Sequence, residues 1–194
     1  MAGTPAVRIA GLPVRTHGPV AGRFLSRELC REVLLEIERS AWWQWSQIDE
    51  DGHTDVNLDF RRGQWCEVPP RCRRLVAGRL LSIGAGLRRH FGPWCGVQGP
   101  NILRYRAGDF FLRHQDERSD AASFRHRRRV TIAAFLNDRG FEGGLLRLHR
   151  FDGGRPLDIV PRAGFFVAFP SETYHEVTPI RGGDRYTLVA WFSS

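Results

Sequence analysis

The chain has 194 residues, 42% of them hydrophobic, which is the size and composition of one globular domain with a substantial core. All 29 basic residues are arginine, and against 21 acidic residues they give a formal charge of +8. No apolar run approaches about 18 residues, which argues against a membrane-spanning helix. The charge indicates a solvated surface biased toward arginine, with attraction of an acidic partner or substrate as the alternative.

The N-terminal residues and the cysteines bear on the cellular compartment. Residues 1–22 contain no apolar run of signal-peptide length. Cys30, Cys66, Cys72 and Cys95 form no Cys-x-x-Cys pair, so free thiols are favoured over disulfides or zinc ligands. We therefore expect a cytoplasmic protein that is not attached to a membrane.

A first helix is predicted from Ser26, which can cap its N-terminus, to about Ser40. Its apolar positions fall at helical spacing and are Leu29, Val33, Leu34 and Ile37. The tryptophans that follow are Trp42, Trp43 and Trp45. We interpret them as core anchors where the helix meets a sheet, with a substrate-stacking surface as the alternative.

A second helix is predicted to begin near Pro69–Pro70 and to end before Gly92–Pro93. Its buried stripe consists of Val76, Leu80, Ile83, Leu87 and Phe91. The two helices are expected to cover one face of a β-rich core. Residues 1–97 are accordingly interpreted as an N-terminal helical support region.

From residue 98 the pattern changes to short strands separated by glycine and proline turns. Eight strands are predicted, near residues 101–105, 109–116, 128–136, 144–149, 156–160, 164–169, 175–180 and 185–192. This number and spacing suit a double-stranded β-helix, the cupin-like jelly roll. We expect a mainly β fold with flanking helices, in which residues 1–194 form a single domain and residues 98–194 its catalytic core.

His114-Gln115-Asp116 is the first candidate for a metal site. Residues i and i+2 of a strand point to the same face, so His114 and Asp116 would project together and Gln115 would face away. His175 from a distant strand would add a third ligand. Two histidines and one carboxylate leave three metal positions open, which is typical of non-haem Fe(II) oxygenases, whereas zinc favours thiolates or three histidines and calcium favours oxygen alone.

Arg185 begins an otherwise apolar strand, ten residues after His175. Strand alternation puts Arg185 and Thr187 on one face, and Tyr186 and Leu188 on the other. A buried guanidinium requires an anion. The pattern therefore predicts an anion site on the same face as Arg185.

The order and spacing of these motifs resemble the prolyl-4-hydroxylase-like branch of the 2-oxoglutarate/Fe(II) dioxygenases. The segments that carry the resemblance cover about residues 98–194. They are Tyr105 to Leu112, His114 to Asp116, Arg129 to Asn137, Phe141 to Gly144, Pro161 to Phe169, Tyr174 to Val177 and Arg185 to Phe192.

The resemblance implies that His114, Asp116 and His175 bind Fe(II), and that Arg185 binds the distal carboxylate of 2-oxoglutarate as a bidentate pair. Thr187 and Tyr105 would assist with their hydroxyls. O2 would be the second co-substrate, and ascorbate is a candidate reductant. Relatives often carry a tyrosine at the position of Phe135, so this chain lacks one hydroxyl that reaches the distal carboxylate.

The resemblance further implies hydroxylation of an unactivated C–H bond, with no catalytic side chain needed beyond the iron site. The substrate would be an amino acid, a peptide or protein residue (prolyl among them) or a natural-product intermediate. In relatives the loop after Asp116 touches substrate. Here it carries Arg125 and Arg127, which are either substrate contacts that favour acidic groups or a solvated charge run.

Two other functions stay open. A nucleic-acid dealkylase of the same superfamily would fit the net charge. Such enzymes carry a second arginine soon after the co-substrate arginine, and no arginine follows Arg185 in this chain. The other alternative is a jelly-roll binding module without turnover, which succinate production would distinguish from an enzyme.

Overall fold

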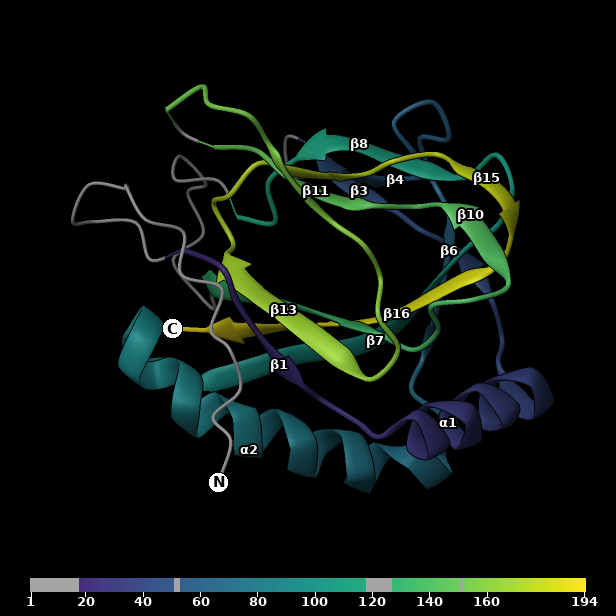
Figure 1. Cartoon of the computed structure of the whole chain (residues 1–194), viewed down its shortest axis with the longest axis horizontal. Helices are drawn as coiled ribbons and strands as arrows, with labels where there is room; N and C mark the ends of the chain where they lie inside the picture. The colour runs from purple at the N-terminus through teal and green to yellow at the C-terminus, as the bar shows by residue number, and fades with distance from the viewer. Residues whose placement is uncertain (1–17, 51–52, 118–126, 151) are drawn as a thin grey trace.

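Two β-sheets face each other, and two helices cover the outer side of the larger sheet (Figure 1). The computed structural model describes residues 18–50, 53–117, 127–150 and 152–194. This arrangement confirms the predicted mainly β jelly roll with flanking helices. Among the described residues, no helix is long and apolar enough to cross a membrane.

Helix α1 (Arg27–Ser40) begins where predicted, because the Ser26 side chain accepts a hydrogen bond from the Leu29 backbone N–H. A short 3-10 helix, η1 (Pro70–Cys72), leads into α2 (Arg73–Phe91). Gly92, at φ +86°, ends α2 in a conformation that glycine adopts without strain. Both helices bury one apolar stripe against the larger sheet, as their periodicity predicts.

The larger sheet has seven strands in the order β1-β13-β9-β16-β7-β6-β2 within the described residues. In that order the strands are Val20–Arg23, Phe165–Pro170, Arg128–Phe135, Arg185–Ser193, Gly96–Tyr105, Gln64–Glu67 and Gln44–Trp45. All of its pairings are antiparallel. Its central strands supply many of the buried apolar residues, among them Ile132, Ala134 and Leu188.

The smaller sheet has five strands in the order β12-β11-β14-β8-β5 within the same residues. They are Leu157–Ile159, Leu146–Leu148, His175–Val177, Phe110–His114 and Arg61–Arg62. Two further antiparallel pairs accompany the sheets. One joins β10 (Phe141–Gly143) to β15 (Ile180–Gly183), and the other joins β3 (Ile48–Glu50) to β4 (His53–Asp55).

Strand β16 separates the two parts of the core. Leu188 and Ala190 pack toward the helices, in the cluster that contains Val33 and Leu80. Arg185 and Thr187, one position out of phase, are buried on the opposite face, toward the smaller sheet. The predicted alternation of this strand is therefore confirmed, and it carries polar groups into the space between the sheets.

The N-terminal region contributes more than helices. Strands β1, β2 and β6 extend the larger sheet, and β5 extends the smaller one. All eight predicted strands are present, and β10 and β15 are additional. The four cysteines are free thiols, as predicted.

The interpretation of three core tryptophans is wrong for two of them. Trp42 is 81% exposed and Trp45 is 45% exposed. Trp45 lies on β2, the last strand of the larger sheet, and Trp42 lies just before it; among the described residues no further strand pairs beyond this edge. Only Trp43 packs against the core, where Arg104 stacks 4.2 Å from its ring.

Candidate metal centre

His114 and His175 face each other across two neighbouring strands. The register pairs His175 of β14 with His114 of β8, and Val177 with Phe111. On β14 one residue separates His175 from Val177, whereas on β8 two residues separate Phe111 from His114. Strand β8 therefore contains a β-bulge. Because of the bulge, Phe111 and His114 both point inward, and their rings stack with centroids 3.4 Å apart. The two histidine rings lie 4.1 Å apart.

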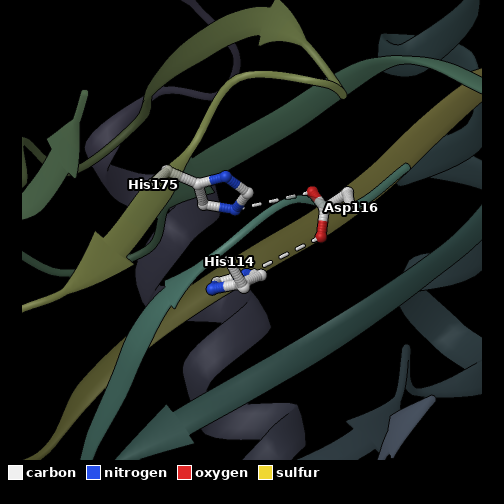
Figure 2. A group of neighbouring side chains, drawn as sticks. All are labelled: His114, Asp116 and His175. Atoms are coloured by element: carbon white, nitrogen blue, oxygen red, sulfur yellow. Dashed lines mark ion pairs between the residues drawn. The ribbon is translucent and has the colours of Figure 1, made fainter. Parts of the chain in front are cut away.

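Asp116 completes the group, although it does not lie in the strand that was expected to carry it. Strand β8 ends at His114, and the Asp116 backbone N–H donates instead to the Ser171 carbonyl at 3.0 Å. Gln115 faces away, as predicted, and donates to the Glu172 carbonyl. The ligand atoms of His114, Asp116 and His175 all lie within 4.8 Å of one another (Figure 2).

The backbone fixes which ring nitrogen of each histidine is free. His114 Nδ1 lies 2.7 Å from the Leu112 carbonyl, and His175 Nδ1 lies 2.8 Å from the Thr173 carbonyl. A carbonyl only accepts, so each Nδ1 carries the proton and each Nε2 keeps its lone pair. Both Nε2 atoms face Asp116, at 3.9 Å for His114 and 3.6 Å for His175.

The protonation states suit a cation. Burial, together with the neighbouring His175, lowers the pKa of His114 well below its ordinary value, so its ring is neutral. Burial acts to raise the pKa of Asp116, but the two histidines and the Thr131 hydroxyl outweigh it and lower that pKa. A neutral imidazole nitrogen and an ionised carboxylate oxygen are the donors that Fe(II) accepts from two histidines and one carboxylate.

Arg185 provides a second, oppositely charged centre between the sheets. It is only 2% exposed, and no carboxylate among the described residues pairs with it. Its guanidinium lies 5.7 Å from the Tyr105 ring centroid and 5.5 Å from that of Phe135. Burial lowers the pKa of Arg185 to about 10, so the group stays charged at neutral pH. A buried cation in this state requires an anionic ligand.

Within the described residues, one atom of this guanidinium and two hydroxyl oxygens beside it are buried without a hydrogen-bond partner. They are Arg185 Nε, the Tyr105 hydroxyl and Thr187 Oγ1. Buried polar groups are rarely left unsatisfied in a folded protein, so the set fits a ligand that carries several oxygens. Tyr105 belongs to the apolar cluster against which Phe111 packs, and the Phe111 ring stacks on His114, so the same cluster borders both the cation and the metal centre.

Gly144 makes room for Arg185. A Cβ on Gly144 would lie 2.8 Å from Arg185 Cδ and 2.3 Å from Ile180 Cδ1, and the residue has φ +63°. The role of Gly144 in making space for Arg185 was not predicted from the sequence. A glycine pair before a strand that faces a buried charge is the signal that could have indicated it.

The predicted substrate residues give no comparable arrangement. Arg127 is paired with two carboxylates, those of Glu172 at 3.1 Å and Glu117 at 3.7 Å. Its charge is therefore already balanced within the protein. Arg125 lies outside the described residues.

Facing sheets that bring two histidines and one carboxylate together define the class of non-haem Fe(II) oxygenases. The profile of the 2OG-Fe(II) oxygenase superfamily matches residues 100–193. Over these residues the chain matches this superfamily, and the similar proteins and structures support the prolyl-4-hydroxylase-like type.

One relative and two solved structures illustrate the similarity. A PKHD-type hydroxylase of Shewanella oneidensis is 30% identical over 126 residues, which are 62% of this chain and 53% of that protein. The chain thus spans about half the length of that relative. A prolyl-4-hydroxylase of Pseudomonas putida superposes with a TM-score of 0.70 at 26% identity, covering 92% of this chain and 93% of that one.

The third similarity shows the fold alone. A prolyl hydroxylase of Trichoplax adhaerens, solved with a peptide fragment of a hypoxia inducible factor oxygen degradation domain, superposes with a TM-score of 0.73. Its sequence identity is 21%, and the match covers 92% of this chain and 84% of that one.

Proposed function

We propose that this chain is an Fe(II)- and 2-oxoglutarate-dependent dioxygenase that hydroxylates an unactivated C–H bond. The observation that carries the proposal is the occurrence of the His114–Asp116–His175 group together with a buried cation, Arg185, for which the described part of the chain supplies no counter-ion. A dicarboxylic keto acid matches both features, because one end can reach the metal while the other neutralises Arg185.

Each residue has a defined part in this proposal. His114 and His175 present Nε2 to the iron, and Asp116 presents a carboxylate oxygen. Arg185 binds the distal carboxylate of 2-oxoglutarate, and the Thr187 and Tyr105 hydroxyls donate to the same ligand. The bound iron would supply the oxidative chemistry, in which O2 and 2-oxoglutarate yield succinate, CO2 and a hydroxylated product. The apolar walls, Phe111 and Phe135 among them, exclude water from the site.

The substrate proposal is an amino acid, an exposed protein or peptide residue such as proline, or a natural-product intermediate. The similarity to prolyl hydroxylases supports the peptide form, and the Trichoplax protein was solved with a peptide. The formal charge of +8 favours substrates with acidic groups. We also propose that residues 1–194 act as one cytoplasmic domain, with residues 98–194 as its catalytic core.

The proposal is tested by following Fe(II)-dependent conversion of 2-oxoglutarate to succinate, with and without candidate peptides and amino acids. His175→Ala should abolish succinate formation, because it removes one of three metal donors. His90→Ala, on α2 and outside the space between the sheets, is the matched control. Full turnover by the His175 variant would remove the metal assignment. For the wild-type protein, mass spectrometry of treated metabolite and peptide pools would identify the substrate by its gain of one oxygen.

A further inference from the structure

Thr131 is a polar residue in the interior of an apolar strand. Strand β9 runs through the centre of the larger sheet, and Thr131 is 2% exposed. Its register neighbours are Phe169 on β13 and Trp191 on β16. A buried hydroxyl at such a position must find a hydrogen-bond partner, so its contacts indicate what it does.

The Thr131 hydroxyl contacts two groups. Its Oγ1 lies 2.6 Å from Asp116 Oδ2 and 3.0 Å from the Ser171 hydroxyl, which is also buried. An ionised carboxylate only accepts, so Thr131 must donate to Asp116. The proton of Thr131 is then committed, and the Ser171 hydroxyl must donate to Thr131. The three side chains form a directed chain from Ser171 through Thr131 to Asp116.

Ser171 also holds the backbone of the same ligand. Its carbonyl accepts hydrogen bonds from the N–H groups of Asp116 at 3.0 Å and Glu117 at 3.1 Å. This matters because Asp116 lies beyond the end of β8 and has no strand neighbour to fix it. One residue therefore anchors the main chain of Asp116 and, through Thr131, its side chain.

The indole of Trp191 completes the surroundings of the carboxylate. Its N–H is buried beside the Asp116 carboxylate and makes no well-formed hydrogen bond among the described residues. With these neighbours, Asp116 directs Oδ1 toward His114 Nε2 and Oδ2 toward His175 Nε2. A carboxylate held in this way needs little reorganisation to bind a cation.

We propose that Thr131 and Ser171 are positioning residues that set the orientation of Asp116, and through it the metal affinity of the site. They touch neither the substrate nor the metal; they act through the carboxylate. The inference rests on the proposed function for the identity of the metal. It does not depend on turnover, because metal binding is measurable in the protein without 2-oxoglutarate or substrate.

The test compares Thr131→Val, which keeps the shape and removes the hydroxyl, with Thr131→Ser, which keeps the hydroxyl. The dissociation constant for Mn(II) is measured by electron paramagnetic resonance. The visible spectrum of the Co(II)-loaded protein reports the ligand geometry. Thr131→Val should weaken Mn(II) binding about 10- to 100-fold, the usual effect of removing a partner of a metal ligand. Thr131→Ser should restore the wild-type spectrum and most of the affinity.

Controls separate positioning from folding. Thr178→Val removes a hydroxyl that accepts from the Leu145 N–H, away from the metal centre, and should leave Mn(II) binding unchanged. Thermal unfolding without metal shows whether each variant is folded. If Thr131→Val does not fold, Ser171→Ala takes its place, and it should weaken binding while leaving the Thr131 hydroxyl present.

The outcomes are distinct for the two proposals. Wild-type affinity in Thr131→Val, or in Ser171→Ala where it stands in, would overturn the inference. Equal weakening in the valine and serine variants of Thr131 would overturn it as well. If the inference is overturned in either way but Asp116→Ala abolishes Mn(II) binding, the metal centre and the proposed function still stand. Wild-type Mn(II) binding by Asp116→Ala would remove the metal centre itself.

Discussion

Arg185 on β16 lies directly opposite Tyr105 on β7, and both side chains are almost completely buried. The rings of Tyr105 and Phe135 flank the guanidinium, but neither supplies a negative charge. Cation–π contacts contribute only about 0.5–2 kcal/mol, which is small beside the cost of removing a charge from water. Without 2-oxoglutarate, the described residues therefore leave the Arg185 charge uncompensated in the proposed co-substrate pocket.

Replacing this cation by an apolar side chain should stabilise the ligand-free protein. Arg185→Met keeps much of the side-chain volume and removes the buried charge, so we expect the free energy of unfolding to rise by about 1–3 kcal/mol. The same variant should lose the thermal stabilisation that 2-oxoglutarate gives to the metal-loaded protein. Chemical denaturation and thermal scans with and without 2-oxoglutarate measure both effects. A less stable ligand-free variant would show that the charge has a partner inside the protein.

The room for Arg185 depends on Gly144. An alanine there would clash with Arg185 and Ile180 and would also strain the backbone at φ +63°. We expect Gly144→Ala to raise the dissociation constant of 2-oxoglutarate at least tenfold and to leave Mn(II) affinity within about twofold. Gly182→Ala, whose Cβ would meet no atom within 4 Å, is the matched control. Unchanged 2-oxoglutarate binding in the Gly144 variant would place the anion site elsewhere.

Phe135 lies where the resemblance described above leads us to expect a tyrosine in many relatives. Its ring already lies 5.5 Å from the guanidinium carbon of Arg185, so a hydroxyl added to it would project into the same pocket. One added hydrogen bond contributes about 1 kcal/mol, so Phe135→Tyr should lower the dissociation constant of 2-oxoglutarate about fivefold. Isothermal titration of the Mn(II)-loaded protein measures it. Weaker binding would indicate that the pocket has no space for the hydroxyl.

A divalent metal should stabilise the fold, because the three donors lie close together only in the folded chain. At a metal concentration 100 times the dissociation constant, we expect about 2.7 kcal/mol of additional unfolding free energy. Thermal scans with Mn(II), and again after addition of a chelator, measure this gain and its reversal. Asp116→Ala should show no metal-dependent shift, and a shift equal to that of the wild type would contradict the assignment of Asp116.

The sequence allowed the helices, the eight strands and the grouping of His114, Asp116 and His175 to be predicted, because each leaves a recognisable pattern. Ser26 and the apolar stripes mark the helices, and strand alternation places Arg185 and Thr187 on one face. Contacts between distant segments leave no such pattern. Thr131 appears in sequence as one polar residue among apolar ones, and only the packing of β9 against the segment after β8 brings it to Asp116.

The tryptophans show that residue type alone does not predict burial. Their size and apolar character favoured burial, but burial depends on whether another element covers the position. Trp42 and Trp45 lie at the sheet edge, where none does. The end of β8 at His114 could not be predicted from the sequence either. It depends on the hydrogen bond that the Asp116 N–H donates to the carbonyl of the distant Ser171.

Because of its bulge, β8 carries one residue more than the stretch of β14 with which it pairs. Leu112 and Arg113 together oppose a single residue of β14. Deleting either one would leave a single residue between Phe111 and His114, and strict alternation would then still place both side chains on the inward face. At the present length, a replacement that straightened β8 and removed the bulge would place Phe111 and His114 on opposite faces, so the bulge is what keeps His114 directed toward His175.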